Sequence, residues 1–272
     1  MEKVRKSRIG FIGFGHMAEV LLQAMFQSKM IQKSQVLFLR KDKKKQKETS
    51  HKWGITAASL KDVVEKSDFC FLCVKPDQVK NLLKEVKEVP SHVLWISIVS
   101  GVPISYFEKL WGEKTQILRV MPNTPSEIGE GMNLFTFSKA VTSEGKSQAK
   151  LLFSSTGMVE EVPESAIDPL TAISGSGPAY VFKLIEAFKT KAKESGISSE
   201  QAEKIVAQTF KGASSLLLKK KNLEGLIQGI AIPGGTTEAG LKVFTGSSIQ
   251  KDIHDVLEAC SQKAKEFHAE FR

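Results

Sequence analysis

The sequence predicts an α/β fold in which an N-terminal, mostly parallel sheet with helices on both faces is followed by an all-α C-terminal domain. Two observations indicate this. From residue 7 to about residue 162, short apolar runs bounded by glycine, proline or charge alternate with amphipathic segments, as expected for parallel strands and their covering helices. Beyond residue 163 the strand signals stop, and long stretches with helical spacing follow. We therefore expect one domain over residues 1–162 and a second over residues 163–272.

The expected strands are short apolar runs with turn-forming or charged residues on either side. They cover Arg8–Gly13, Val36–Leu39, Phe69–Val74, Leu94–Ser97, Gln116–Val120, Met132–Phe137 and Met158–Val162. Amphipathic spacing between them predicts the helices His16–Ser28, Leu60–Lys66, Val79–Lys87 and Ser143–Ser154. The second domain is expected to hold the helices Pro178–Ser195, Ser199–Lys220 and Ile249–Phe271.

Length and composition indicate a globular protein without a membrane span. The 272 residues, 41% of them hydrophobic, are enough for a sizeable core. No apolar run approaches the ~20 residues that cross a bilayer, and the basic start of the chain leads into a glycine-punctuated strand rather than a signal-peptide core. We expect no membrane partner and a cytoplasmic location.

The spacing of cysteine and histidine argues against a metal centre or a disulfide. Cys70 and Cys73 lie three residues apart within one expected strand, so their side chains should face opposite sides of the sheet. A zinc ion or a redox dithiol needs both sulfurs on one side. The five histidines fall in no metal-ligand spacing, and no Gly-x-Ser-x-Gly segment offers a serine nucleophile. We expect no metal.

The net charge of +9 is concentrated near the N-terminus, where residues 1–50 hold 12 Lys and Arg against 4 Asp and Glu. Such a cluster attracts nucleic acid or a phosphorylated cofactor, or is simply solvated. Because no aromatic platform is interleaved with the basic residues, we expect no nucleic-acid partner.

The first expected strand runs directly into a glycine fingerprint. This Gly-x-Gly-x-x-Ala segment consists of Gly13, Phe14, Gly15, His16, Met17 and Ala18. Gly13 permits the tight strand-to-helix turn, Gly15 lets the backbone approach a pyrophosphate, and Ala18 lets the helix lie close to the sheet. At the first strand of an α/β chain, this pattern predicts a Rossmann-type domain that binds a dinucleotide at the start of the following helix.

The end of the second expected strand favours NADPH, with NADH as the other possible cofactor. NAD-binding folds commonly place an acid there to bind the ribose, whereas this chain has Arg40 and Lys41, with Asp42 only afterwards. The Arg40 guanidinium suits a 2′-phosphate. The lysines over residues 43–47 are also typical of a solvated helix face, so that alternative stays open for them.

Four further segments accompany the fingerprint. They are Val74-Lys75-Pro76, Arg119-Val120-Met121-Pro122-Asn123-Thr124-Pro125, Ser174-Gly175-Ser176-Gly177-Pro178-Ala179-Tyr180 and Pro233-Gly234-Gly235-Thr236-Thr237. Together, in this order and at these spacings, they resemble pyrroline-5-carboxylate reductases from about residue 8 to residue 270. The resemblance implies hydride transfer from NAD(P)H to Δ1-pyrroline-5-carboxylate, giving L-proline in the final step of proline biosynthesis. It also implies a homodimer or a larger homo-oligomer built through the helical domain.

The resemblance also implies roles for individual residues. The cofactor cleft is expected to be lined, chiefly by backbone groups, by Val74, Lys75, Pro76, Ser100, Gly101 and Asn123. The carboxylate of the cyclic imine is expected at the turn formed by Gly234, Gly235, Thr236 and Thr237, with the Thr237 hydroxyl near the ring nitrogen. Glu164 matches a family acid that lies close to bound substrate. For Thr237 the alternative is an N-cap of the following helix.

Departures from the family pattern keep alternatives open. Ile227-Gln228 and Ile232 stand where family members often carry Lys-Asp and Ser, and His16 replaces the usual Asn. A lost hydroxyl beside the carboxylate is also compatible with another imine substrate or with a non-catalytic NADP-binding paralogue. A related β-hydroxyacid-type dehydrogenase is a further alternative, but it needs a lysine base about one turn earlier than Lys183.

Overall fold

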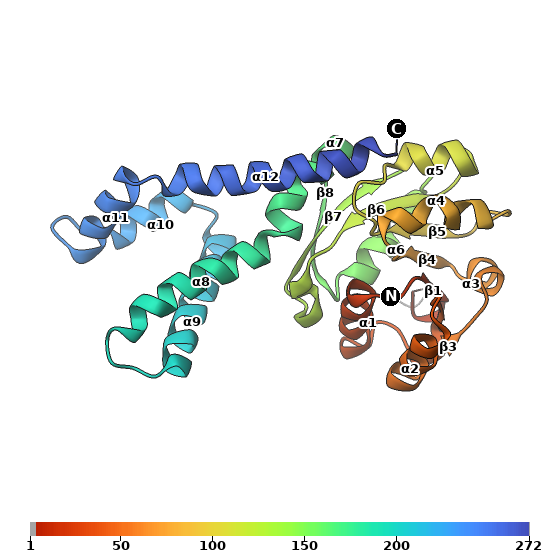
Figure 1. Ribbon diagram of the computed structural model, residues 1–272, viewed down its shortest axis with the longest axis horizontal. Coiled ribbons are helices and arrows are strands. Elements are labelled where there is room, and N and C mark those ends of the chain that lie inside the picture. The colour runs from red at the N-terminus through yellow and green to blue at the C-terminus, as the bar shows by residue number, and fades with distance from the viewer. Residues whose placement is uncertain (1–3, 272) are drawn as a thin grey trace. The chain divides into compact units, whose positions relative to one another are not determined.

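The computed structural model describes residues 4–271, apart from the side chains of Arg5 and His268, so the outermost residues of the two expected domains lie outside it. Within this part, eight strands form one sheet in the order β3-β2-β1-β4-β5-β6-β7-β8 (Figure 1). Neighbouring strands are parallel except β6 and β7, which are antiparallel. The strands are β1 Ile9–Ile12, β2 Val36–Leu39, β3 Thr56–Ala57, β4 Phe69–Leu72, β5 Leu94–Ser97, β6 Ile117–Met121, β7 Gly131–Phe137 and β8 Gly157–Glu161.

Helices follow most of these strands, as parallel connections require. They are α1 His16–Gln27, α2 Lys43–Trp53, α3 Leu60–Lys66, α4 Pro76–Glu85, α5 Ile104–Trp111, α6 Ser143–Phe153 and α7 Glu164–Leu170. After a π-helical turn, η4 Thr171–Gly175, come α8 Gly177–Lys193, α9 Ser199–Lys220, α10 Leu223–Ile230, α11 Thr236–Gly246 and α12 Ile249–Ala269. The predicted fold class is confirmed.

The sheet buries both of its faces, because alternate residues of each strand enter different cores. On one face, Phe11 of β1 stacks on Phe71 of β4 at a ring-centroid distance of 4.7 Å, and α1 and α6 cover them. On the other face, α3, α4 and α5 pack over Ile12. Cys70 belongs to the second core and Cys73 packs against the first, so the prediction that the two thiols face opposite ways is confirmed. Among the described residues, no three His, Cys, Asp or Glu side chains gather as a metal site.

The chain divides into two compact units, Met1–Pro178 with Ala259–Arg272 and, separately, Ala179–Glu258. The division falls within α8 and α12, later along the chain than the predicted boundary after residue 162. The physical reason is that α7 buries Ile167 against Met121 and Leu134 of the sheet, and so remains with the strands. None of the described helices is long and apolar enough to cross a bilayer.

The helical unit Ala179–Glu258 is held by local interactions. Ser198 and Gln201 form a reciprocal capping box at the start of α9. The Phe188 ring packs edge-on against Phe210 at 5.2 Å. Within this unit, neither α10 nor α11 contains a buried residue, and large apolar side chains stay exposed along its helices.

Candidate active site

The glycine fingerprint forms a tight turn from β1 into α1. Gly13 has φ +81°, and its N–H donates to the Leu39 carbonyl at 2.9 Å. A Cβ at Gly13 would lie 2.7 Å from the Cys73 carbonyl oxygen and 2.8 Å from Val74 Cγ1. Only glycine fits this position, because the backbone after β4 passes directly beside it. The same contact brings Val74 to the fingerprint loop.

Gly15 leaves open space at the start of α1. It is the N-cap residue with extended backbone, no side chain caps the helix, and a Cβ built there meets no atom within 4 Å. In the described part of the chain, no side-chain hydrogen bond caps the first N–H groups of α1. Uncapped amides and the positive end of the helix dipole favour a phosphate group at this place.

The remaining fingerprint residues divide into core and surface. Phe14 is buried and packs on Phe11 and Phe38 at ring distances of 5.5 and 5.2 Å, so its side chain belongs to the core. Ala18 is also buried, which lets α1 lie close to the sheet. His16 is exposed and Met17 is half-buried at the start of the helix. The loop can therefore offer a dinucleotide mainly its backbone.

The end of β2 carries a fixed arginine. Arg40 Nη1 donates to Thr49 Oγ1 of α2 at 3.0 Å, while Lys41 is exposed. Asp42 caps α2, because its carboxylate accepts from the Lys45 N–H at 3.0 Å. That amide hydrogen bond, assisted by the charges of Lys45 and Arg40, lowers the pKa of Asp42. The carboxylate of Asp42, the first acid after β2, thus caps its own helix. The groups that remain for a ligand at this strand end are the cationic side chains of Arg40 and Lys41.

The carboxyl ends of β4 and β5 face the same edge of the sheet as the fingerprint, because these strands are parallel to β1. Lys75 occupies the N-cap position of α4 without forming a side-chain cap, and Pro76 is the first residue of that helix. Ser100 is half-buried, and Gly101 turns the chain after β5 with φ +76°. In sheets of this order, dinucleotides bind at such carboxyl ends, beside the point where the strand order reverses.

The side chain of Asn123 connects three segments of the chain by hydrogen bonds. Its Nδ2 donates to the Ser174 carbonyl at 2.9 Å, and its Oδ1 accepts from the Met132 N–H at 3.0 Å. The amide thus joins the end of β6 to β7 and to the π-helical turn. The Asn123 side chain thus makes structural hydrogen bonds at both of its polar atoms.

Glu164 is held in a cluster of charged groups that sequence reasoning missed. Its carboxylate accepts from the Ile104 N–H at 2.7 Å and from Arg119 Nη1 at 3.4 Å. Arg119 is 1% exposed and also pairs with the carboxylate of Asp168, one turn after Glu164 on α7. The signal was present, since Arg119 is a charged residue in the otherwise apolar strand Ile117–Met121. A cavity of about 380 Å³ lies beside Glu164 and Asp168.

The expected substrate turn belongs to the helical unit Ala179–Glu258. Gly234 has φ +75°, and its N–H donates to the carboxylate of Glu238 at 2.8 Å. Gly235 is the N-cap of α11, so Thr236 and Thr237 are its first two residues, and no side chain of the described residues caps the helix. Thr237 is half-buried and does not occupy the N-cap position that was its alternative interpretation. The sequence analysis also missed Glu238. Its position in the first turn of a helix, directly after the glycine turn, could have indicated that its carboxylate contacts the turn.

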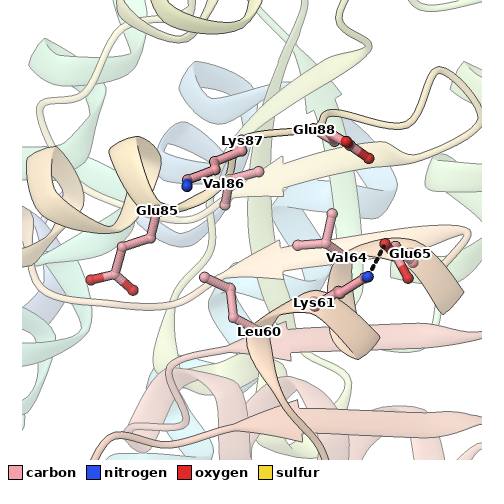
Figure 2. A pocket seen from close by; sticks show the side chains of 8 residues that line it. All are labelled: Leu60, Lys61, Val64, Glu65, Glu85, Val86, Lys87 and Glu88. Carbon is pink, nitrogen blue, oxygen red and sulfur yellow. Dashed lines mark ion pairs between the residues drawn. The ribbon is translucent and has the colours of Figure 1, made fainter.

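A cavity of about 400 Å³ between α3 and the end of α4 has a different character (Figure 2). Its charged lining combines Lys61 and Lys87 with Glu65, Glu85 and Glu88, and Lys61 pairs with Glu65 at 3.7 Å. It lies at the C-terminal end of α4, whereas the N-terminal end of that helix carries Lys75 and Pro76. With three carboxylates, this cavity does not suit an anionic cofactor.

Comparison with known proteins gives relatives that match almost the whole chain. The family of pyrroline-5-carboxylate reductase dimerisation domains matches residues 164–267, and that of coenzyme F420-dependent NADP oxidoreductases matches residues 8–101. The chain is 32% identical to the pyrroline-5-carboxylate reductase of Aquifex aeolicus, over 95% of this chain and 96% of that protein. It is 31% identical to pyrroline-5-carboxylate reductase 2 of Bacillus subtilis, over 97% and 96% of the two chains.

A solved structure agrees with these relatives. The crystal structure of a Plasmodium falciparum pyrroline carboxylate reductase with NADP bound is similar with a TM-score of 0.87 and 30% identity, over 97% of this chain and 99% of that one. Sequence and fold thus agree over nearly the full length of these proteins. The chain belongs to the pyrroline-5-carboxylate reductase family.

Proposed function

We propose that this protein reduces Δ1-pyrroline-5-carboxylate to L-proline, the last step of proline biosynthesis, with NADPH as the hydride donor and NADH as a possible substitute. The observation that carries the proposal is the match of nearly the whole chain to reductases of this name. The uncapped first turns of α1 and α11 supply the two anion-binding positions that a dinucleotide and a carboxylate substrate require.

For the cofactor, the residues present fit the group. The open space at Gly15 and the free amides of α1 would hold the pyrophosphate, and Arg40 with Lys41 would meet the 2′-phosphate. Val74, Lys75, Pro76, Ser100, Gly101 and the Asn123 backbone would line the path of the nicotinamide half. A nicotinamide held there would supply the hydride that reduces the imine carbon.

For the substrate, the turn before α11 supplies the binding groups. The free N–H groups of Thr236 and Thr237, at the positive end of the helix, would hold the carboxylate, and Gly234 and Gly235 shape the turn. The Thr237 hydroxyl would orient the ring nitrogen. Because an iminium needs little further activation, the work of these residues is to hold the C=N bond in near-attack geometry.

Glu164 was expected beside the substrate, and its contacts favour an indirect effect. Its carboxylate already accepts from the Ile104 N–H and from Arg119. We therefore propose that Glu164 positions the start of α5 close to Ser100 and Gly101, and influences the reaction through that segment.

We further propose that the protein acts as a homodimer or a larger homo-oligomer in the cytoplasm. The match to a dimerisation family over residues 164–267 supports the dimer, as do the apolar side chains exposed on α8 to α12. The cysteines of the described residues are all free, as is usual in a reducing compartment. Light scattering tests the oligomeric state, and cell fractionation tests the cytoplasmic location.

The test of the activity is the loss of NADPH absorbance with racemic pyrroline-5-carboxylate, with NADH and piperideine-6-carboxylate as comparison substrates. Rapid turnover with the pyrroline and NADPH is expected. Binding of NADPH without turnover of either imine would instead support the second candidate, a non-catalytic NADP-binding paralogue. That candidate is favoured by Ile232, which is 69% exposed where the family often has serine.

A further inference from the structure

Arg40 is held in place by a buried hydroxyl. Arg40 Nη1 donates to Thr49 Oγ1 at 3.0 Å, and Thr49 is only 4% exposed within α2, while Arg40 is half-buried at the end of β2. We propose that Thr49 is a specificity-determining positioning residue, which orients the Arg40 guanidinium toward the 2′-phosphate of the cofactor. The proposal rests on the proposed use of NADPH.

The hydrogen bond fixes one arm of the guanidinium and leaves the others available. Arginine has five N–H donors in a planar fork, and Thr49 engages a donor on Nη1. In the described part of the chain, no carboxylate forms an ion pair with Arg40. The Nε and Nη2 donors therefore remain for a second acceptor, and a phosphate is well matched to such a pair of donors.

The surroundings of Arg40 favour an anion. Asp42 is engaged as the N-cap of α2, so its carboxylate is turned to the Lys45 amide. Lys41 and Lys44 are exposed on either side of this cap. A phosphate bound by Arg40 would thus enter a cationic region at the start of a helix, where a ribose with two free hydroxyls would gain far less.

Thr49 suits this role because its side chain is rigid. It is β-branched, lies in the interior of a helix and is buried, so its Oγ1 has few positions available. An arginine anchored in this way loses less rotamer freedom when it binds a phosphate. The lower entropy cost increases the affinity for a phosphorylated ligand. The effect should depend on the 2′-phosphate, since only that group meets the oriented donors.

The alternative is that the hydrogen bond only satisfies a buried hydroxyl. In that case its loss would lower the stability of α2 without distinguishing between NADP⁺ and NAD⁺. Ser50 provides a matched control, because it follows Thr49 in the same helix and its hydroxyl donates to the Ile55 carbonyl at 2.6 Å instead of contacting Arg40.

The experiment measures dissociation constants of NADP⁺ and NAD⁺ by calorimetry for the wild type, Thr49→Val, Thr49→Ser and Ser50→Ala. Valine keeps the shape of threonine but cannot accept a hydrogen bond. We expect Thr49→Val to weaken NADP⁺ binding about three- to tenfold and NAD⁺ binding less than about twofold. Thr49→Ser should restore the preference, and Ser50→Ala should keep it. Equal weakening of both nucleotides by Thr49→Val, or no weakening at all, would overturn the proposal.

An Arg40→Ala variant separates this proposal from the cofactor assignment. If Arg40→Ala weakens NADP⁺ more than NAD⁺ and Thr49→Val does not, the cofactor assignment stands and the role of Thr49 is wrong. If Arg40→Ala affects both nucleotides equally, the 2′-phosphate is bound elsewhere and the assignment of Arg40 itself fails. The double variant should have the same NADP⁺ to NAD⁺ ratio as Arg40→Ala alone, because Thr49 acts only through Arg40.

Discussion

Gly13 and Gly15 stand two residues apart, and only Gly13 has no room for a side chain. At Gly13 the exclusion comes from the protein itself, since φ is +81° and a Cβ would meet the Cys73 carbonyl at 2.7 Å. At Gly15 the backbone is extended and a Cβ would meet no atom within 4 Å. The protein itself therefore leaves room for a side chain at Gly15.

This difference predicts opposite outcomes for two alanine variants. Gly13→Ala should lower the free energy of unfolding by about 1–3 kcal/mol, because it adds strain and a backbone clash. Gly15→Ala should unfold like the wild type but bind NADP⁺ at least about tenfold more weakly, because its methyl group occupies the approach of the pyrophosphate. Urea unfolding and calorimetry measure the two quantities. Normal NADP⁺ binding by a folded Gly15→Ala protein would show that the dinucleotide does not approach this amide.

Thr237 is the residue on which the proposed orientation of the imine depends. It is half-buried in the first turn of α11 but is not its N-cap, so removal of the hydroxyl should leave the helix intact. We expect Thr237→Ala to lower kcat/KM for pyrroline-5-carboxylate by about 10- to 100-fold. Thr245→Ala, at an exposed position of the same helix, is the control and should retain the wild-type rate. A wild-type rate for Thr237→Ala would remove its hydroxyl from the reaction.

At the residue scale, the sequence identifies groups that act through local geometry. The fingerprint glycines and Arg40 follow strands directly, so their positions could be predicted from the strand ends. Thr49 and Asp168 could not, because each meets its arginine partner only through packing of α2 or α7. Thr49 lies nine residues after Arg40 in a helix whose face shows no apolar stripe, and nothing in its neighbourhood distinguishes it from a surface threonine.

At the scale of elements, the Arg119 cluster joins β6 to α7 and α5. Arg119 is almost fully buried, pairs with Asp168 and Glu164, and leaves its Nε without a partner among the described residues. Asp168→Ala would leave the buried guanidinium with only its longer contact to Glu164 at 3.4 Å, so it should lower the free energy of unfolding by about 1–3 kcal/mol. Urea unfolding measures this loss.

A double replacement tests the physical reason. Arg119→Met with Asp168→Leu removes both charges and leaves apolar side chains of similar size, so it should restore most of the stability lost in Asp168→Ala. If the double variant were as unstable as the single one, the loss would come from packing around α7 rather than from the guanidinium's lost partner.

In α11, a carboxylate of the protein already occupies the proposed substrate turn. Glu238 accepts from the Gly234 N–H at 2.8 Å and also pairs with Lys242 at 3.3 Å. A substrate carboxylate at this turn would be repelled by its charge, by about 1 kcal/mol at a separation of roughly 4 Å in water. Glu238→Gln keeps an acceptor and removes the charge, so we expect KM for pyrroline-5-carboxylate to fall about fivefold while KM for NADPH stays the same.

Glu224→Gln is the matched control for this prediction. It removes the same charge from α10, where Glu224 accepts only from Gln228 among the hydrogen bonds of the described residues. A rise of KM in Glu238→Gln would mean that Glu238 supports the shape of the turn instead of competing with the substrate.

Several elements that the sequence did not predict have no clear sequence pattern of their own. α2 has no apolar stripe, since its sequence is almost entirely polar, and it is defined by the Asp42 cap and by Gly54 at its end. α5 contains Ile104, Tyr106 and Phe107 close together, which is also typical of a strand. β3 has only two residues and exists through pairing with β2. Local caps define α2, whereas packing and strand pairing decide α5 and β3.

For the whole molecule, the fold class could be predicted because strand and helix periods occupy separate parts of the chain. The limits of the two compact units could not be predicted from the sequence. α8 and α12 each contribute to both units. Within one continuous helix, the sequence pattern does not show at which residue the packing partners change. The composition likewise gives no sign that the apolar side chains of Ala179–Glu258 remain exposed, because exposure depends on how many neighbours a helix has.

That exposure leads to the last prediction. Within Ala179–Glu258, Phe182 of α8 is 64% exposed, Leu218 of α9 is 60% exposed and Val243 of α11 is 74% exposed, more than an isolated helical unit of this size normally leaves in water. If a second copy of the chain covers these side chains, Phe182→Asp should weaken the dimer by about thirtyfold or more and lower activity at low protein concentration. Lys183→Ala, at the next position of the same helix, should leave the dimer intact. Sedimentation over a concentration series, with activity measured in parallel, distinguishes the cases: a wild-type dimer for Phe182→Asp would place the interface on another face, and a fully active monomer would mean that one chain completes the site alone.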